Sequence, residues 1–259
     1  MLADAHIHLV DLLERDSSFP ERLAAADWIG CAASHDEREF GRSEELRSVI
    51  ESSGRASFVS SFGIHPQWAV WKNADFLAGL AAGGRIAAVG EAGFDFFGDR
   101  PERVRTPENE RTQRGVFEFQ LALAERHGLP ILLHLRKAMD LAYAYAGRLK
   151  RLRGAVFHSF SGTERDVESL LAKGVPAWFS FGTPILKGNK RSRAACAAAP
   201  IDRLLAETDA PWQPLAGAPH CRAEDISAVL AEIAAIRGLE PRRVEEQIEG
   251  NFRRCYGPG

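Results

Sequence analysis

The stretch TQRGVFEFQLALAERHGLPILLH, residues 112–134, joins a helical pattern to an apolar run that ends in a histidine. Apolar residues from Val116 to Leu123 recur at the spacing that places side chains on one face of a helix. Gly128 and a proline follow, as is usual beyond a helix C-terminus. We therefore predict a helix that ends before Gly128, followed by a buried strand that ends at His134.

The same alternation of short apolar runs and longer amphipathic stretches continues along the whole chain. Eight runs are predicted to be strands: Leu2–Leu9, Trp28–Ala33, Ser57–Gly63, Arg85–Gly90, Pro130–Leu135, Ala155–Phe160, Pro176–Phe181 and Leu204–Thr208. Further helices are predicted at Thr163–Lys173, which opens with a capping-box pattern, at Glu224–Arg237 and from Pro241 toward Ile248. This order predicts a single (β/α)8 TIM barrel domain over residues 1–259. An open doubly wound sheet also fits the alternation, but no GxGxxG motif follows the first strand.

Composition narrows the class of protein. The chain has 259 residues, 45% of them hydrophobic, and its 33 Lys and Arg nearly balance 35 Asp and Glu. A net charge of −2 excludes a global polyanion-binding field, so any contact with nucleic acid must be local.

The four cysteines form no CxxC pair and predict reduced thiols. No apolar run is long enough to span a membrane, and Asp4 leaves no room for a signal peptide. We expect a cytoplasmic enzyme, and we predict no membrane contact and no stable protein partner.

The placement of the histidines is the strongest functional signal in the sequence. Only His127 of the eight histidines falls on a predicted helix. The others lie in a predicted strand near its end or in the loop after one: His6, His8, His35, His65, His134, His158 and His220. Since the carboxyl ends of barrel strands meet at one face, these imidazoles are expected to converge there.

Carboxylates are predicted to join this cluster. His6 and His8 have the i, i+2 spacing that directs both rings to one side of a strand, and Asp4 can orient a ligating imidazole. Glu91 follows an apolar run, and Asp209 follows the last predicted strand. For any one histidine a packed core residue is the commoner outcome, and a helix cap is the alternative for Glu91. Taken together, the pattern predicts six metal ligands: His6, His8, Glu91, His134, His158 and Asp209.

Four imidazoles and two carboxylates suit two divalent cations, such as Zn²⁺ or Mn²⁺, with Mg²⁺ as a further option. A carboxylate that bridges two cations is the natural spacer in such sites, and we assign this role to Glu91. His6, His8 and Asp209 would complete one cation site, and His134 and His158 the other. Asp209 is also predicted to accept the proton of the attacking water, so Glu91 and Asp209 are the predicted catalytic residues.

Six ordered motifs resemble the TatD-related metal-dependent deoxyribonucleases of the amidohydrolase-like barrel group. They are DAHIHL (4–9), GIHP (63–66), GEAGFD (90–95), the stretch 113–136, HSFSG (158–162) and LLAETDAP (204–211). The resemblance spans nearly the whole chain. It implies a β/α barrel, a divalent-metal centre on the same six ligands, and hydrolysis of phosphodiester bonds in DNA. Two segments depart from the family pattern, around Leu215–Arg222 and Pro184–Asn189. Both departures concern substrate choice rather than metal binding.

Three residues are predicted to contact substrate. The resemblance places His65 of GIHP beside the site. Arg136 shares a strand side with His134, and Lys187 lies after strand seven, where barrels often bind phosphate, although a solvated surface explains Lys187 equally well. Tryptophans such as Trp68 can stack bases or simply pack, and the charged loop at 97–110 is predicted to be a solvated rim.

Three functions fit these features. The first is a deoxyribonuclease, plausibly acting at strand ends because a pocket at the mouth of a barrel admits a chain end more easily than a duplex. The second is a barrel hydrolase of small amides, lactones or phosphate esters that uses the same cations. The third is a binding protein that keeps its cations for structure, which open coordination positions would disfavour. DNA is the predicted partner as substrate.

Overall fold

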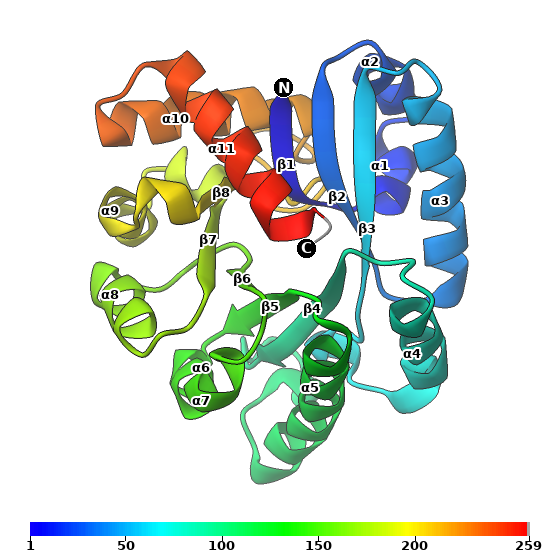
Figure 1. The fold of residues 1–259 in the computed structure, drawn as a ribbon, viewed down its shortest axis with the longest axis vertical. Helices are drawn as coiled ribbons and strands as arrows, with labels where there is room; N and C mark the ends of the chain where they lie inside the picture. The colour runs from blue at the N-terminus through cyan, green and yellow to red at the C-terminus, as the bar shows by residue number, and fades with distance from the viewer. Residues whose placement is uncertain (258–259) are drawn as a thin grey trace.

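Eight parallel strands form one sheet in the computed structural model, which describes residues 1–257, and helices surround the sheet (Figure 1). The strands follow one another in chain order, from β1 to β8. Their bounds are β1 (Leu2–Ile7), β2 (Trp28–Ser34), β3 (Ala56–Phe62), β4 (Ala88–Asp95), β5 (Ile131–Arg136), β6 (Ala155–Phe157), β7 (Ala177–Phe181) and β8 (Leu204–Ala206). The predicted TIM barrel is confirmed, because each predicted run overlaps one strand of this sheet. The prediction of a single domain over 1–259 stays a prediction, and residues 258–259 lie outside the described part.

The first and last strands meet just beyond their carboxyl ends. The backbone N–H of Asp209 donates to the carbonyl of His6 at 3.0 Å, and the N–H of His8 donates to the carbonyl of Ala210 at 2.9 Å. The buried carboxylate of Asp4 on β1 accepts hydrogen bonds from the backbone and the hydroxyl of Thr208. These contacts place the segment after β8 directly beside β1.

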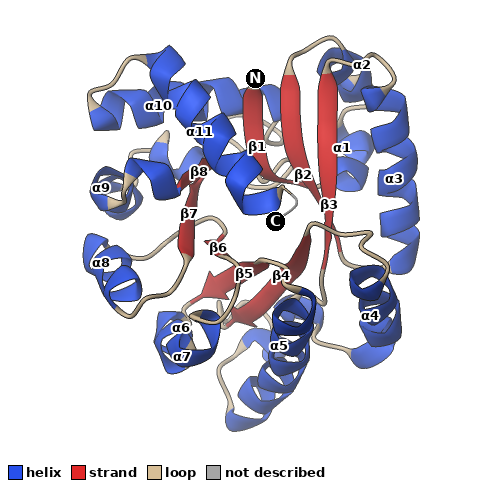
Figure 2. Cartoon of the chain, in the orientation of Figure 1, coloured by secondary structure: helices blue, strands red, loops and turns tan. Residues whose placement is uncertain are grey.

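Helices cover the outside of the strands (Figure 2). Their bounds are α1 (Leu9–Arg15), α2 (Phe19–Ala24), α3 (Glu37–Glu51), α4 (Ala74–Ala82), α5 (Pro107–His127), α6 (Met139–Ala144), α7 (Ala146–Leu149), α8 (Glu164–Ala172), α9 (Lys190–Ala198), α10 (Ile226–Arg237) and α11 (Pro241–Tyr256). The capping box predicted at the start of α8 is confirmed, with Thr163 and Asp166 exchanging hydrogen bonds.

Two helices begin where the sequence analysis predicts no helix. Helix α5 begins at Pro107, because the Thr106 side chain accepts a hydrogen bond from the Asn109 amide and caps the helix. Helix α9 begins at Lys190 and is capped in the same way by Asn189. Among the residues that the structure describes, no helix is both long and apolar enough to cross a membrane.

Strand β4 lies later in the chain than predicted, so Glu91 falls inside it rather than after it. The two flanking glycines explain the shift. Gly90 and Gly93 have φ values of 144° and 142°, which side chains rarely adopt. A Cβ at Gly90 would lie 2.6 Å from Leu132, and one at Gly93 would lie 2.3 Å from the carbonyl of His134. The backbones of β4 and β5 therefore approach closely on both sides of Glu91, which fixes this carboxylate in the barrel.

Candidate metal centre

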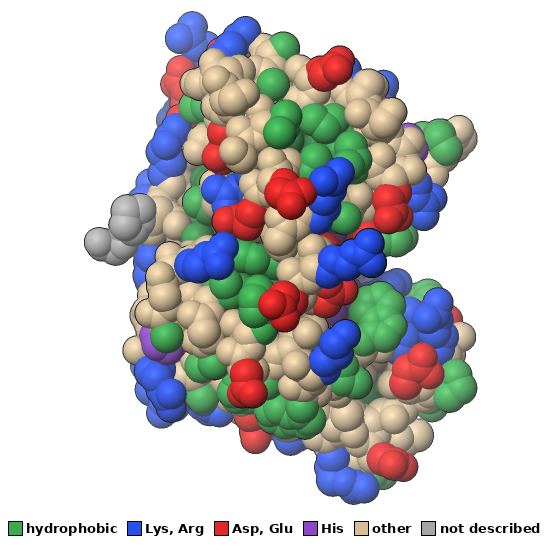
Figure 3. Space-filling view, turned by 90° about the vertical axis from the view of Figure 1, so that its right-hand side faces the viewer, with side chains coloured by type: hydrophobic (Ala, Val, Ile, Leu, Met, Phe, Trp, Pro, Cys, Tyr) green, Lys and Arg blue, Asp and Glu red, His purple; other side chains and the backbone are tan. Residues whose placement is uncertain are grey.

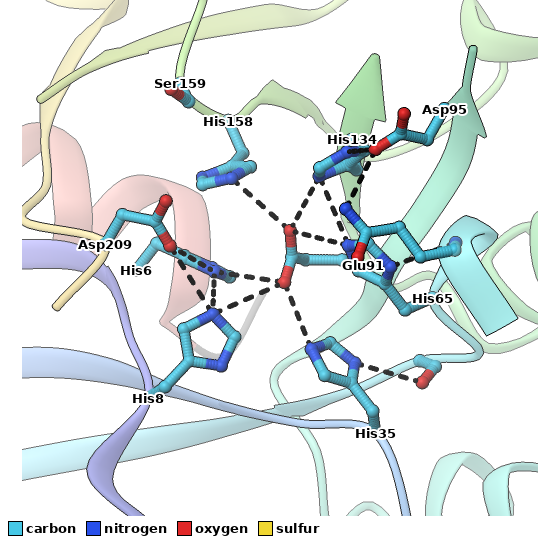
Figure 4. A network of polar contacts seen from close by, with 12 residues as sticks. His6, His8, His35, His65, Glu91, Asp95, His134, His158, Ser159 and Asp209 are labelled. Atoms are coloured by element: carbon cyan, nitrogen blue, oxygen red, sulfur yellow. Dashed lines mark hydrogen bonds and ion pairs between the residues drawn. The ribbon is translucent and has the colours of Figure 1, made fainter. Parts of the chain in front are cut away.

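Glu91 lies at the centre of a cluster of imidazoles (Figure 4). Its Oε2 atom lies 3.2 Å from Nε2 of His6, 3.5 Å from Nε2 of His8 and 3.1 Å from Nε2 of His35. The Oδ1 atom of Asp209 lies 3.6 Å from the His6 nitrogen and 3.4 Å from the His8 nitrogen. We call His6, His8, His35 and Asp209 the Oε2 side of the centre. It combines residues from β1 with residues that follow β2 and β8.

The other oxygen of Glu91 has a second set of imidazoles. Oε1 lies 3.1 Å from Nδ1 of His134, 3.3 Å from Nε2 of His158 and 3.6 Å from Nε2 of His65. We call His65, His134 and His158 the Oε1 side. It combines residues from β5 with residues that follow β3 and β6. Six imidazoles therefore surround one carboxylate, three at each oxygen.

Buried carboxylates lie behind two histidines of the Oε1 side. Nε2 of His134 lies 2.9 Å from Oδ2 of Asp95, and Nδ1 of His158 lies 3.1 Å from Oε1 of Glu207. Glu207 also accepts a hydrogen bond from the backbone N–H of Ser159. A carboxylate behind a ligating imidazole fixes its tautomer and its orientation. Asp95 therefore orients His134 through a hydrogen bond, whereas Glu207 contacts Nδ1 of His158 without hydrogen-bond geometry. In both rings the other nitrogen faces Glu91.

Asp95 is itself held by Arg103, and this corrects a prediction about the loop at 97–110. Arg103 is buried, and its guanidinium donates to both oxygens of Asp95 and to Asp99. The prediction of a solvated rim is therefore wrong for Arg103. Burial opposes the charge of Asp95, but its contacts with His134, Gln67 and Arg103 outweigh burial and hold its pKa well below the usual range.

The predicted role of Asp4 is also wrong in detail. Its carboxylate accepts from the backbone N–H of His6 rather than from the imidazole. Together with the contacts to Thr208 described above, this ties β1 to the segment after β8. Among the described residues, Nδ1 atoms of three histidines of the centre, His6, His8 and His158, are buried without a hydrogen-bond partner. Asp4 therefore positions the backbone of the two strands rather than the ring of His6.

Asp209 has an unusual backbone conformation. Its φ of 57° lies in the left-handed region, which aspartate tolerates better than most residues. Its Oδ2 accepts a hydrogen bond of 2.6 Å from Nε2 of Gln213, whose φ is also 57°. Burial opposes a charge on Asp209, but His158 and His8 outweigh burial and lower its pKa to about 2. Asp209 is therefore ionised at neutral pH.

The histidines of the centre differ in their readiness to hold a proton. Burial opposes a charge on His8 and His158, but nearby carboxylates outweigh burial and raise their pKa values to about 9 and about 10. Burial and the neighbouring His134 lower the pKa of His65 to about 3, so His65 is neutral. Burial disfavours the charge on Glu91, but the surrounding imidazoles hold its pKa well below the usual value.

The donor set fits a divalent cation. Four groups of three side chains in the centre bring their nitrogen and oxygen atoms within 4.8 Å of one another: His6, Glu91 and His158; His6, His8 and Asp209; His8, His35 and Glu91; His65, Glu91 and His134. Nε2 of His6 and Nε2 of His8 lie only 3.1 Å apart. Imidazole nitrogens and carboxylate oxygens are the ligands that Zn²⁺ and Mn²⁺ accept. The centre is thus a buried His, Glu and Asp cluster with the chemistry of a metal site, and it contains all six predicted ligands.

A pocket of about 560 Å³ opens onto this centre. Of the predicted substrate residues, His65 and Arg136 line it, and the Arg136 guanidinium lies 4.1 Å from the centre of the Phe97 ring. Lys187 is exposed outside this lining, and its Nζ donates to the carbonyl of Gln213 at 3.0 Å. Trp68 lines the pocket and is 56% exposed, so it is free to contact a ligand.

Sequence reasoning missed His35, Asp95 and Glu207 as members of the site. His35 already belonged to the set of histidines that follow strands, and that signal could have assigned it. Glu207 lies two residues before Asp209, and Asp95 lies four residues after Glu91 in the motif GEAGFD. Neither spacing by itself distinguishes a carboxylate that binds a cation from one that supports an imidazole.

Charged side chains of both signs are interspersed on the face that Figure 3 shows. This distribution agrees with the near-zero net charge of the chain. A phosphate backbone that reached the pocket would therefore be held by individual residues near the centre rather than by a broad basic surface on that face.

Comparison with known proteins identifies relatives along the full barrel. A family model described as "TatD related DNase" matches residues 3–257. Two relatives named "3'-5' ssDNA/RNA exonuclease TatD" come from Cronobacter sakazakii and Klebsiella pneumoniae. The first is 32% identical over 207 residues and the second 31% over 208, each match covering 76% of both chains. A crystal structure of a TatD homologue from Escherichia coli K12 matches with a TM-score of 0.81 at 25% identity, covering 100% of this chain and 98% of that chain.

Proposed function

Because the chain belongs to the TatD-related DNase family, we propose that it is a divalent-metal-dependent exonuclease that removes nucleotides from the 3′ end of single-stranded DNA or RNA. The observation that carries this proposal is the arrangement of six imidazoles around Glu91 at the base of a pocket. Such a cluster would be costly to bury without a cation to share its lone pairs and charge.

Two cations are proposed, one on each side of Glu91. His6, His8 and Asp209 would hold the first, and His134 and His158 the second. Glu91 would be shared between them. Zn²⁺, Mn²⁺ and Mg²⁺ are the candidates. When bound, such a pair makes water a stronger nucleophile near neutral pH and offsets the negative charge of the phosphoryl oxygens.

The chain's own residues supply the proton transfer. Asp209 is ionised at neutral pH and lines the pocket beside Glu91, so it can accept the proton of the attacking water. Gln213 holds Oδ2 of Asp209, which leaves Oδ1 directed toward the cluster. His65 is neutral, and its Nδ1 accepts a hydrogen bond from the backbone N–H of Gln67. Its Nε2 therefore carries the proton and can donate to a phosphoryl oxygen.

The pocket suits a strand end. Its volume of about 560 Å³ falls in the range of small-molecule sites, ~300–1,000 Å³, and is enough for a terminal nucleotide. Arg136 is the proposed phosphate contact, since its guanidinium is exposed at the pocket and supported by Phe97. Trp68 and Trp212 also line the pocket with exposed rings on which bases can stack. Lys187 is the weaker candidate, because its Nζ is already bonded to Gln213.

A labelled single-stranded oligonucleotide tests the proposal. With a 5′ label, the purified chain is expected to produce a ladder that shortens from the 3′ end, and chelator is expected to stop it. An oligonucleotide whose 3′ end is blocked should stay intact, and the Asp209→Asn variant should lose at least ~100-fold in rate. Inertness toward both DNA and RNA with either Mn²⁺ or Zn²⁺ bound would contradict the proposed substrate. Full activity of Asp209→Asn would contradict the proton-acceptor role.

A further inference from the structure

We propose that His35 is a further ligand of the cation on the Oε2 side, through Nε2, and that it biases this position toward transition metals over Mg²⁺. The inference rests on the proposed function, since it concerns the same metal centre. His35 follows β2 and lines the pocket. Its Nε2 lies 3.1 Å from Oε2 of Glu91, as close as any imidazole nitrogen in the centre.

The tautomer of His35 supports the role of a ligand. Its Nδ1 lies 3.4 Å from the backbone carbonyl of Gly63, in hydrogen-bond geometry. A carbonyl oxygen can only accept, so a ring that keeps this bond while Nε2 binds a cation carries its proton on Nδ1 and its lone pair on Nε2. That lone pair is directed at the Oε2 side of Glu91. Histidines that bind metals commonly donate their other ring N–H to a backbone carbonyl in this way.

His65 provides the contrast. It also lies close to Glu91, but its Nδ1 accepts from the backbone N–H of Gln67, which can only donate. The proton of neutral His65 therefore sits on Nε2, the nitrogen that faces Glu91 and His134. This nitrogen can donate a hydrogen bond but has no lone pair for a cation. Both histidines lie close to Glu91. Their backbone partners differ, so His35 is the proposed ligand and His65 the proposed hydrogen-bond donor.

The backbone of His35 is also held in place. Its N–H donates to Oε2 of Glu39 at 2.6 Å, and its carbonyl accepts from Nδ2 of Asn73 at 2.7 Å (Figure 4 shows the ring beside Glu91). The ring therefore does not need a large rearrangement to reach a cation. A ligand that is preorganised in this way contributes more to affinity than one that must be ordered on binding.

The predicted consequence is metal preference. With His35, the Oε2 side offers three imidazoles and two carboxylates to one cation. Nitrogen ligands favour Zn²⁺, Co²⁺ and other transition metals, whereas Mg²⁺ prefers carboxylates and water. His35 should therefore strengthen Zn²⁺ binding much more than Mg²⁺ binding.

Competition with a chromophoric chelator measures this preference on the 259-residue chain. In His35→Ala, one of the two Zn²⁺ dissociation constants should rise at least ~10-fold, while Mg²⁺ affinity changes by less than about threefold. The visible absorption spectrum of the Co²⁺-loaded chain should change as well, because a nitrogen ligand is lost. His35→Asn gives the same comparison with a polar side chain, and a thermal melt checks that each variant is folded.

A histidine variant outside the centre serves as the control. His127→Ala removes an imidazole from α5, away from the centre. It should keep the Zn²⁺ affinities and the Co²⁺ spectrum of the unmodified chain. If His35→Ala also keeps them, the inference is overturned, and a raised KM alone would assign His35 to substrate instead. If the unmodified chain itself binds no cation, the proposed function fails together with the inference.

Discussion

The two sides of Glu91 use the same residue types in different ways. On the Oε2 side, Asp209 faces the imidazole nitrogens directly. On the Oε1 side the further carboxylates lie behind the imidazoles, where Asp95 supports His134 and Glu207 supports His158. In the proposed centre, the Oε2 side would present its negative charge to a cation, and the Oε1 side would use it to orient the imidazoles.

This difference suggests two sources of cation affinity in the proposed centre, one for each side. A direct carboxylate adds charge attraction and a group that can accept a proton. A carboxylate behind an imidazole fixes the ring and raises its basicity without occupying a coordination position. We therefore expect the Oε2 side to carry the proton-accepting chemistry and the Oε1 side to be the more rigid of the two.

Glu91→Gln has the largest expected effect, because both sides of the proposed centre depend on this carboxylate. Loss of the bridging charge is expected to release at least one cation and to lower the rate at least ~1,000-fold, which corresponds to several kcal/mol of transition-state stabilisation. Metal content measured by mass spectrometry and nuclease rate on a single-stranded oligonucleotide check this. Glu125→Gln, which removes a surface carboxylate from α5, is the matched control. Two retained cations in Glu91→Gln would disprove bridging.

Glu207→Gln is expected to change cation binding on the Oε1 side alone. An amide cannot attract the His158 ring as a carboxylate does, so the cation affinity of the Oε1 side should fall by ~10–100-fold. The other dissociation constant should stay within about threefold of the unmodified chain. Calorimetric titration with Zn²⁺ resolves the two constants. Equal weakening of both would mean that Glu207 supports the whole barrel rather than one imidazole.

The pH dependence of metal binding follows from the raised pKa values of His8 and His158. Without a competing cation these imidazoles hold protons up to pKa values of about 9 and about 10. Cations bind the neutral imidazole, so binding must release those protons. Affinity should therefore rise with pH by up to ~10-fold per pH unit for each proton released, from roughly pH 6 to pH 8. Titrations in buffers with different ionisation enthalpies count the protons, and a pH-independent affinity would contradict the assignment.

Arg136→Ala tests the proposed contact with the substrate phosphate rather than the binding of either cation. Removing the guanidinium should raise KM for a single-stranded oligonucleotide by ~3–10-fold and leave both cation affinities unchanged. Lys187→Ala should have a smaller effect, below about threefold, because its Nζ is bonded to Gln213. Steady-state kinetics at fixed Mn²⁺ concentration compare the two variants. A larger effect for Lys187→Ala would reverse their proposed roles.

The fold and the core of the centre could be predicted because barrel topology converts sequence position into spatial position. Any residue at the carboxyl end of a barrel strand is brought to one face, whatever its distance along the chain. His6, His134 and Asp209 come together for this reason, although about half of the sequence separates His134 from His6 and most of it separates Asp209 from His6. The same rule says little about which way a side chain turns after it leaves the strand.

The remaining features depend on contacts that the sequence does not encode locally. The distinction between His35 and His65 rests on whether a backbone carbonyl or a backbone N–H lies beside Nδ1. The shift of β4 depends on how closely β5 approaches Gly90 and Gly93. The burial of Arg103 follows from its pairing with Asp95 across the loop. Each of these is set by tertiary packing, which overrides local pattern.

Crystals grown with Mn²⁺ and measured near its absorption edge would show directly whether two cations share Glu91. We expect two anomalous peaks, one beside each oxygen of Glu91, with nitrogens of His6 and His8 at the first and of His134 and His158 at the second. Spacing of ~3.5–4 Å between the peaks is expected for a bridged pair. A single peak away from Glu91, or no peak within reach of these side chains at saturating Mn²⁺, would contradict the proposed two-cation centre.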